Sequence, residues 1–261
     1  MDVTPSRSMP SSSSSSSQRA SSIQSSKSTP SNIVPCLLPL LVVANKIDLP
    51  QPLTRDELNR ATTLFDDMDR NHDGVIDIVE FQAVMEALEK NATLSTLILN
   101  NCGLKSEHLA FVAKALKTNR TITHLDLGGN SFGSLEPLAQ ALRANPVLRV
   151  LALGKSGLKP ERGPELASGL DGDCKLEVLR LDGNGDLGDE GCAAVASVLE
   201  RVASLRELSM PGTGLGSATS DALCASLRGS GRGLLLDVRD NPGITLDGAR
   251  KLVELSRARP P

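Results

Sequence analysis

The sequence predicts an α/β fold in which parallel strands line the inside of a short solenoid and helices cover its outside. The pattern L-x-x-L-x-L-x-x-[N/C/S/T] occurs in six copies, beginning at Leu94, Ile122, Leu148, Leu176, Leu205 and Gly233. The copies are spaced 28, 26, 28, 29 and 28 residues apart, enough for one strand and one helix each. Apolar residues make up 39% of the chain but include no Trp or Tyr, so the core is aliphatic, which suits stacked layers.

Residues 1–50 form the first predicted region, a Ser-rich tail followed by a short apolar segment. Fifteen of the first thirty-five residues are serine, and such a composition buries too little apolar area to offset its ordering entropy. We therefore expect residues 1–32 to be disordered, as a plain tail or as a transit peptide. The apolar segment Ile33–Ala44 is too short to cross a bilayer and is broken by Pro35 and Pro39, so we expect no membrane insertion.

Directly after this segment, Asn45-Lys46-Ile47-Asp48 resembles the guanine-recognition motif NKxD of small GTPases. The phosphate-binding pattern GxxxxGK[ST] is absent from the sequence, so nothing here would hold a triphosphate. The segment is a remnant of a GTPase-like protein or a chance match.

Residues 51–90 read as a helix, a loop and a second helix. Thr54 and Glu57 form a capping-box pattern, and apolar residues then recur at helical spacing to make one face. The second helix is expected over Ile78–Asn91. Between the helices stands D-R-N-H-D-G-V-I-D-I-V-E, residues 69–80, in which oxygen-bearing side chains alternate and Gly74 permits a sharp bend.

This loop resembles the EF-hand family at all twelve positions. The resemblance implies an α-helical EF-hand that binds one Ca²⁺, with ligands at Asp69, Asn71, Asp73, Val75 (backbone carbonyl), Asp77 (through water) and Glu80 (two oxygens). It also places Ile76 where the family pairs its loops in a strand-like manner. Since we find one such loop, Ile76 should pack on the first repeat or pair with a second chain. We expect the former, and thus a monomer.

Residues 91–261 hold the six repeats. The leucines of each L-x-L core should point to the buried side of one strand. The turn residues that end the strands include Asn130, Asn184 and Asn241, whose side chains can bond the backbone of neighbouring layers. Strand plus helix at this period resembles the ribonuclease-inhibitor class of leucine-rich repeats over Ala87–Leu255. In the sixth copy Gly233 replaces the first leucine, and we expect a short helix and an exposed or capped edge at Leu234–Leu236.

The end of the second helix matches the repeats. Its sequence ALEKNATLSTL recurs as ALKTNRTITHL and ALRANPVLRVL, which begin at Ala115 and Ala141. We therefore expect the helix to end the calcium-binding unit and begin the array. Ala87 and Leu88 should both pack beneath Leu94 and Leu97.

No catalytic or cofactor-binding pattern appears, so we expect a protein that is not an enzyme. The net charge of −3 is spread along the chain, which argues against nucleic acid as a partner.

The segment Asp182–Asp186 resembles the start of a second calcium loop, but Leu187 stands where glycine is needed. His72, His108 and His124 lack ligand spacing, and Cys102, Cys192 and Cys224 occupy apolar repeat positions. We expect buried thiols in a reducing, cytoplasmic setting, or an organelle if the tail is a transit peptide.

The side chains predicted to line the concave strand face are polar and of mixed charge. They are Thr96, Ile98, Asn100, His124, Asp126, Val150, Ala152, Lys155, Val178, Arg180, Asp182, Glu207, Ser209, Leu235, Asp237 and Arg239. This face is either an ordinary solvated sheet or a docking surface. Our interpretation is a calcium-binding protein-interaction module that docks an unidentified protein. The alternative is a regulator of a small GTPase, with Arg180 as its arginine.

Overall fold

Six strands form one parallel sheet, and their order along the sheet is their order in the sequence. The computed structural model describes residues 33–34, 76–171, 173–228 and 233–257. The strands are β3 (Thr96–Ile98), β4 (His124–Asp126), β5 (Val150–Ala152), β6 (Val178–Arg180), β7 (Glu207–Ser209) and β8 (Leu235–Asp237). The register sets Leu97, Leu125, Leu151, Leu179, Leu208 and Leu236 opposite one another. The first five are buried and Leu236 is half-buried, so one leucine row runs beneath the sheet.

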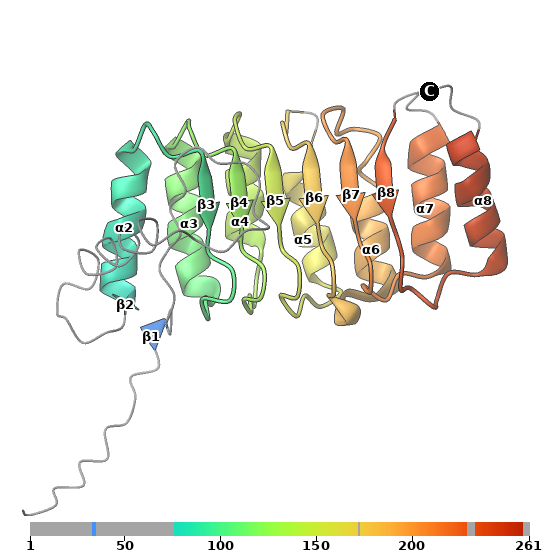
Figure 1. The fold of residues 1–261 in the computed structure, drawn as a ribbon, viewed down its shortest axis with the longest axis horizontal. Helices are drawn as coiled ribbons and strands as arrows, with labels where there is room; N and C mark the ends of the chain where they lie inside the picture. Colours follow the sequence, from blue (N-terminus) through green and yellow to red (C-terminus); the bar gives the residue numbers. More distant parts are fainter. Residues whose placement is uncertain (1–32, 35–75, 172, 229–232, 258–261) are drawn as a thin grey trace, which may run out of the picture. The chain divides into compact units, whose positions relative to one another are not determined.

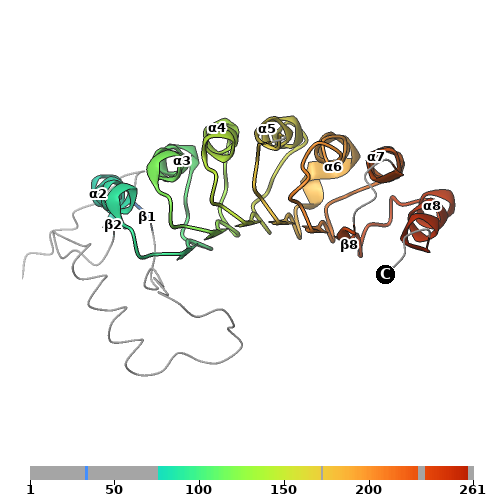
Figure 2. The same cartoon turned by 90° about the horizontal axis from the view of Figure 1, so that it is seen from above.

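A helix follows each strand and packs on the buried side of the sheet, beside the helices of the adjacent layers (Figures 1 and 2). The helices are α2 (Ile78–Lys90), α3 (Ser106–Thr118), α4 (Glu136–Ala144), α5 (Arg162–Gly169), α6 (Gly188–Ala196), α7 (Ser217–Arg228) and α8 (Leu246–Arg257), with a 3-10 turn, η1 (Gly185–Leu187), before α6. The predicted arrangement, strands inside and helices outside, is confirmed for the repeats. None of the helices in the described ranges is both long and apolar enough to cross a membrane.

Buried asparagine side chains join the layers, as the turn residues predict. Asn130 Oδ1 accepts hydrogen bonds from Cys102 N (3.1 Å) and Leu104 N (3.0 Å) in the preceding layer. Its Nδ2 donates to Leu99 O and Leu127 O, each at 2.8 Å. Asn184 and Asn241 make corresponding bonds, so the loops after the strands have their backbone groups satisfied without water.

A second set of asparagines joins the layers at the helix ends. Asn119 Nδ2 donates to Leu88 O (2.7 Å) and Asn91 O (3.0 Å), and Asn145 Nδ2 donates to Leu116 O (2.6 Å). The helix predicted over Ile78–Asn91 is α2, and it packs beside α3 as α3 packs beside α4. It is therefore the first layer of the array, as the repeated junction indicated.

One detail of that junction is wrong in our prediction. Leu88 is buried, but Ala87 is exposed, whereas its repeat equivalent Ala115 is 2% exposed. Ala115 lies in α3, which has α2 on one side and α4 on the other. No helix precedes α2 in the described part of the chain, and this leaves the outer side of Ala87 uncovered.

The sixth layer also differs from expectation. Its helix α8 has 12 residues, so the expected short helix is wrong. The expected exposed edge is found at Leu235, whose side chain is 66% exposed. Leu234 and Leu236 remain half-buried against the core. The apolar character of this layer is thus divided between the core and the surface.

Two short strands lie before α2. β1 (Ile33–Val34) and β2 (Ile76–Asp77) pair antiparallel, with Ile33 opposite Asp77 and Val34 opposite Ile76. We expected Ile76 to find no strand partner within the predicted EF-hand and to pack on the first repeat or pair with a second chain; its strand partner Val34 lies outside residues 51–90, in the same chain. The partner comes from the apolar segment after the Ser-rich region. The remainder of the predicted region 1–50, including Asn45–Asp48, lies outside the described residues.

The buried cysteines agree with the sequence prediction. Cys102, Cys174, Cys192 and Cys224 are buried. Burial raises the pKa of Cys174, Cys192 and Cys224 above its ordinary value, because a thiolate is poorly solvated there. These thiols therefore serve the core as small apolar groups.

Replacing Asn130 by alanine should destabilise the protein by on the order of 3 kcal/mol, because buried backbone donors and acceptors in two layers lose their partner. Chemical denaturation measures the loss. The matched control is Asn100→Ala: Asn100 is exposed and donates one hydrogen bond, to Asp126, so its loss should stay below about 1 kcal/mol. Equal losses in both variants would contradict a structural role for the buried amide.

The hydrogen bonds of the Asp189 side chain lead us to predict that the stability of the fold depends on pH. Its carboxylate accepts hydrogen bonds from Gly216 N (2.9 Å), Ala218 N (2.9 Å) and Thr219 N (2.8 Å) at the start of α7. Burial alone raises the pKa of Asp189, but the hydrogen bonds from Thr219, Ala218 and Gly216 outweigh it and hold the pKa below its ordinary value. The folded pKa is the lower one, so this stabilisation is present above the unfolded value of about 3.9 and is lost as the pH falls through the folded value.

Asp189→Ala should therefore cost about 2 kcal/mol at pH 7. The difference in the free energy of unfolding between the variant and the unmodified protein should become smaller as the pH falls below about 4. Urea denaturation at pH 7, 5 and 3.5 tests this. A difference that stays constant over this range would mean that the carboxylate charge plays no part.

Candidate functional site

The strand face opposite the helices carries the side chains that alternate with the buried leucines. The predicted concave residues of all six strands lie on it, half-buried or exposed, except for Ser209. Ser209 is 8% exposed because its hydroxyl donates to Asp182 Oδ1. The prediction of this face from the repeat pattern is therefore confirmed in its placement.

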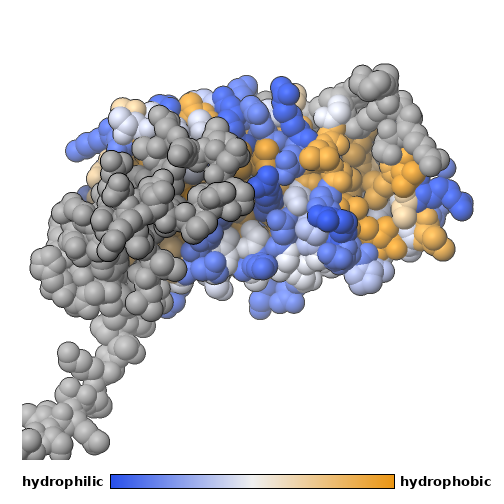
Figure 3. Space-filling model, in the orientation of Figure 1, coloured by the Kyte–Doolittle hydropathy of each residue, from blue (hydrophilic) through white to orange (hydrophobic). Residues whose placement is uncertain are grey.

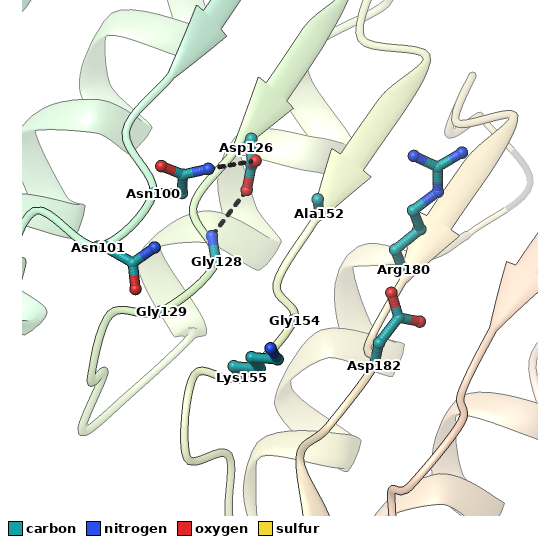
Figure 4. A pocket seen from close by; sticks show the side chains of 10 residues that line it. All are labelled: Asn100, Asn101, Asp126, Gly128, Gly129, Ala152, Gly154, Lys155, Arg180 and Asp182. Carbon is teal, nitrogen blue, oxygen red and sulfur yellow. Dashed lines mark hydrogen bonds between the residues drawn. The ribbon is translucent and has the colours of Figure 1, made fainter. Parts of the chain in front are cut away.

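A depression of about 320 Å³ lies on this face across β3 to β6, where the strands end (Figure 4). Gly128, Ala152 and Gly154 line its centre, and their small size leaves the space open. The other lining residues are Asn100, Asn101, Asp126, Gly129, Lys155, Arg180 and Asp182. The depression thus has a floor of backbone and methyl groups and a rim of polar side chains.

The two sides of the depression carry different groups. On one side, Asp126 accepts hydrogen bonds from Asn100 Nδ2 (3.2 Å) and Gly128 N (2.9 Å) (Figure 4). On the other, Arg180 Nε donates to Glu207 Oε1 at 3.0 Å. Arg180 was the residue named for GTPase activation. Its described side-chain contact, with Glu207, does not favour GTPase activation. The GTPase-regulator alternative therefore stays a prediction.

A second hollow, of about 510 Å³, lies over β7 and β8 and is more apolar. Leu235, Leu236 and Val238 line it, with Glu207, Ser209, Asp237 and Arg239 around them. Figure 3 shows apolar surface gathered toward the β8 end of this face. The Arg239 guanidinium donates to Asp237 (2.6 Å) and holds the pKa of that half-buried carboxyl below its ordinary value. An apolar hollow with a charged rim is the composition typical of a contact surface.

The predicted calcium site falls only partly within the described residues. Asp69, Asn71, Asp73 and Val75 lie outside them. Asp77 is the N-cap of α2: its Oδ1 accepts from Val79 N (2.7 Å) and Glu80 N (2.9 Å). Glu80 is 6% exposed, and its Oε2 accepts from Asp77 N at 3.0 Å.

Asp77 and Glu80 thus hold two carboxylates at the first turn of α2, where the predicted loop ends. Carboxylate oxygens are the ligands that Ca²⁺ prefers, so the described part of the donor set fits the ion. Within the described ranges no three His, Cys, Asp or Glu side chains gather as a metal site. The segment Asp182–Asp186 is excluded as a second calcium site, because the side chain of Asn184 is buried and hydrogen-bonded to the backbone of two layers.

The two histidines that the structure describes, His108 and His124, contact neighbouring residues of the fold. His108 is 1% exposed, and its Nδ1 accepts from Lys105 N (3.1 Å) at the start of α3. Its ring meets Phe81 of α2 edge-on, with the centroids 5.4 Å apart, and burial lowers its pKa. His124 lies on the strand face with its Nδ1 2.8 Å from Thr123 Oγ1. His72 lies outside the described residues.

Sequence reasoning missed the depression, although it named six of its lining residues, Asn100, Asp126, Ala152, Lys155, Arg180 and Asp182. The missed residues are Asn101, Gly128, Gly129 and Gly154. The available signal was glycine at the same place after two adjacent strands, Gly128 after β4 and Gly154 after β5, each one residue beyond a buried leucine. Such positions remove side chains from one spot on two adjacent strands.

Comparisons with known proteins agree with the repeat architecture. A family model described as "Leucine Rich repeat" matches residues 118–134 and 172–196. The ribonuclease inhibitor of Sus scrofa is 27% identical over 209 residues, which cover 67% of this chain and 46% of the relative. The Tonsoku-like protein of Bos taurus is 34% identical over 143 residues, which cover 52% of this chain and 10% of the relative.

The chain therefore contains leucine-rich repeats and has ribonuclease-inhibitor-like relatives, and it spans less than half the length of these relatives. Among solved structures, "Leiomodin-1 Actin-Binding Site 2 (ABS2)" aligns with a TM-score of 0.46 and 17% identity over 69% of this chain and 87% of that chain. The matched family segments lie within the repeats and do not include residues 69–80.

Proposed function

We propose that this chain is a protein-interaction module whose strand face docks a partner protein, and that the loop before α2 binds Ca²⁺. The observation that supports docking most strongly is the apolar hollow over β7 and β8, where Leu235 of the edge strand β8 is 66% exposed. Apolar side chains that are gathered in one hollow with a polar rim, as Leu235, Leu236 and Val238 are, are typical of a surface that a partner covers. Relatives named ribonuclease inhibitor are, by that name, proteins that act on another protein.

The fold gives this face the rigidity that docking requires. The buried leucines and bridging asparagines hold each strand, so the outward side chains project from a fixed frame. A preorganised face loses little conformational entropy on binding. Long loops are not needed, because the strands themselves present the contact residues.

Calcium binding is supported by the sequence of the loop and by the two carboxylates at its described end. Bound Ca²⁺ supplies a cross-link between the loop and the first turn of α2. In this chain Asp77 caps the helix and Glu80 completes the capping box. Because α2 is also the first layer of the repeats, an ion held at Glu80 stabilises the end of the array by linkage. The strand pair β1–β2, which includes Asp77, ties the same loop to Ile33–Val34.

The test of calcium binding is calorimetric titration of the full chain, with an expected dissociation constant in the sensor range, roughly 10⁻⁷–10⁻⁵ M. Glu80→Gln should abolish most of the binding, because it removes a charged, two-oxygen ligand. Glutamine also suits the third helical position of a capping box, so the helix start should persist. The control is Glu86→Gln, the same change on the exposed side of α2, which should bind as the unmodified protein does. Unchanged affinity in Glu80→Gln would contradict the proposed ligand set.

The test of docking is affinity capture from an extract of the cells that make the protein. Leu235→Asp should lose the captured partner, because a charge in the apolar hollow must be desolvated on binding. The control is Leu246→Asp, since Leu246 is 89% exposed and lies on α8, outside the strand face. Both variants should melt within a few degrees of the unmodified protein, because both side chains are exposed. A partner that binds both variants equally well does not use this hollow.

A further inference from the structure

We propose that the depression at the ends of β4, β5 and β6 receives a carboxylate of the partner protein, an aspartate or glutamate side chain, which binds Lys155 and Arg180. This inference rests on the proposed function, because it concerns the same strand face. It adds the chemical class of the group that the face recognises. It comes from the backbone conformation of one residue and from the hydrogen bonds around it.

The first turn after each strand needs a positive φ angle in every layer. The six residues at this position are Asn101 (φ 53°), Gly129 (68°), Lys155 (53°), Gly183 (70°), Gly212 (62°) and Asp240 (58°). Glycine adopts this conformation freely, and asparagine and aspartate tolerate it. Lys155 is the exception, since a lysine side chain makes the left-handed region unfavourable.

The fold gains nothing from a lysine at this place. Lys155 N donates to Asp182 O at 2.7 Å, and glycines make the same bond in neighbouring layers, from Gly129 N to Gly154 O and from Gly183 N to Pro211 O. A glycine at position 155 would therefore satisfy the sheet without strain. An unfavourable backbone conformation that the fold does not require points to a use for the side chain.

The side chain of Lys155 is exposed and lies at the edge of the depression (Figure 4). A Cβ added at Gly183 would lie 3.0 Å from Lys155 Cγ, so the glycine leaves room for the lysine stem. Among the ion pairs of the described residues, none involves the Lys155 ammonium. Its three N–H donors face solvent in the free protein.

The Lys155 ammonium and the terminal nitrogens of Arg180 are cationic donors at the rim that the hydrogen bonds of the described residues do not use. Asp126 accepts from Asn100 and Gly128, and Asp182 accepts from Ser209, so both carboxylates already have internal donors. Arg180 uses Nε for Glu207. In the described part of the chain its two terminal nitrogens make no hydrogen bond, and Figure 4 shows them at the side of the depression opposite Asp126. A group that fits here accepts hydrogen bonds and carries negative charge, which describes a carboxylate.

The surrounding charges favour a single carboxylate over a polyanion. The strand face and its turns carry five acidic residues and three basic ones: Asp126, Asp182, Glu207, Asp237 and Asp240 against Lys155, Arg180 and Arg239. A nucleic acid or an anionic membrane would meet this net negative surface and be repelled. One acidic side chain brings a single negative charge to Lys155 and Arg180, with the Asp182 carboxylate between them (Figure 4), whereas a polyanion brings many charges to the whole face. The volume of about 320 Å³ also admits the backbone that carries that side chain.

The experiment is selection of random twelve-residue peptides, displayed on phage, on the immobilised full chain. We expect the selected peptides to share an acidic residue at one position. In the tightest peptide, changing that residue to its amide should weaken binding by about tenfold or more. Lys155→Gly and Arg180→Gln should each weaken binding of the acidic peptide by a similar factor. The matched control is Lys159→Gly, which removes an exposed lysine that does not line the depression.

Thermal melting separates loss of recognition from loss of fold. Lys155→Gly should melt at or above the temperature of the unmodified protein, because glycine relieves the left-handed strain. Peptides without an acidic preference would overturn the inference, as would acidic peptides that bind Lys155→Gly and Arg180→Gln normally. Tighter binding of a single-stranded oligonucleotide, dependent on the same two residues, would also overturn it. Peptides that ignore Lys155 but are lost with Leu235→Asp would overturn this inference and leave the docking function standing.

Discussion

The architecture depends on buried amide side chains that satisfy the backbone between layers. Backbone hydrogen bonds between layers extend from the three-residue strands to the first turn residue, as at Lys155 N, and the rest of each turn leaves backbone donors and acceptors in a region without water. Asn130, Asn184 and Asn241 bond two layers each on the strand side, and Asn119 and Asn145 do so at the helix ends. Their residue type is therefore dictated by hydrogen bonding, whereas the leucines around them are dictated by volume.

The side chains on the strand face opposite the helices are therefore not needed to hold the layers together. A side chain there is neither in the leucine row nor in the amide bridges, so it can vary without disturbing the stack. The result is a face with a polar depression near its middle and an apolar hollow at its β8 end. Lys155 is informative for this reason. Its backbone has a positive φ angle, although the stacking of the layers does not require a lysine there. The residues at the same position in the two adjacent layers are glycines.

Helix α2 connects the two predicted functions of the chain. Its first turn is held by Asp77 and Glu80, the two predicted calcium ligands that the structure describes. Its last turn is held by Asn119, which belongs to the next layer. In the function proposed above, an ion held at Glu80 would stabilise the repeats through this helix, because the helix is bonded at both ends. The pairing of Val34 with Ile76 adds a contact from a segment more than forty residues upstream.

The sequence by itself determined the number of layers, the buried leucine register and the bridging asparagines, because each follows from a period that every copy repeats. Leu97 lies opposite Leu125, and Asn130 bonds the preceding layer, as the pattern predicts. The calcium loop stays a prediction, since most of it lies outside the described residues. Only the tertiary structure decided the exposure of Ala87, the strand partner of Ile76 and the shape of the depression. These depend on residues from different layers or distant segments, and periodicity within one repeat does not show which groups meet across the stack.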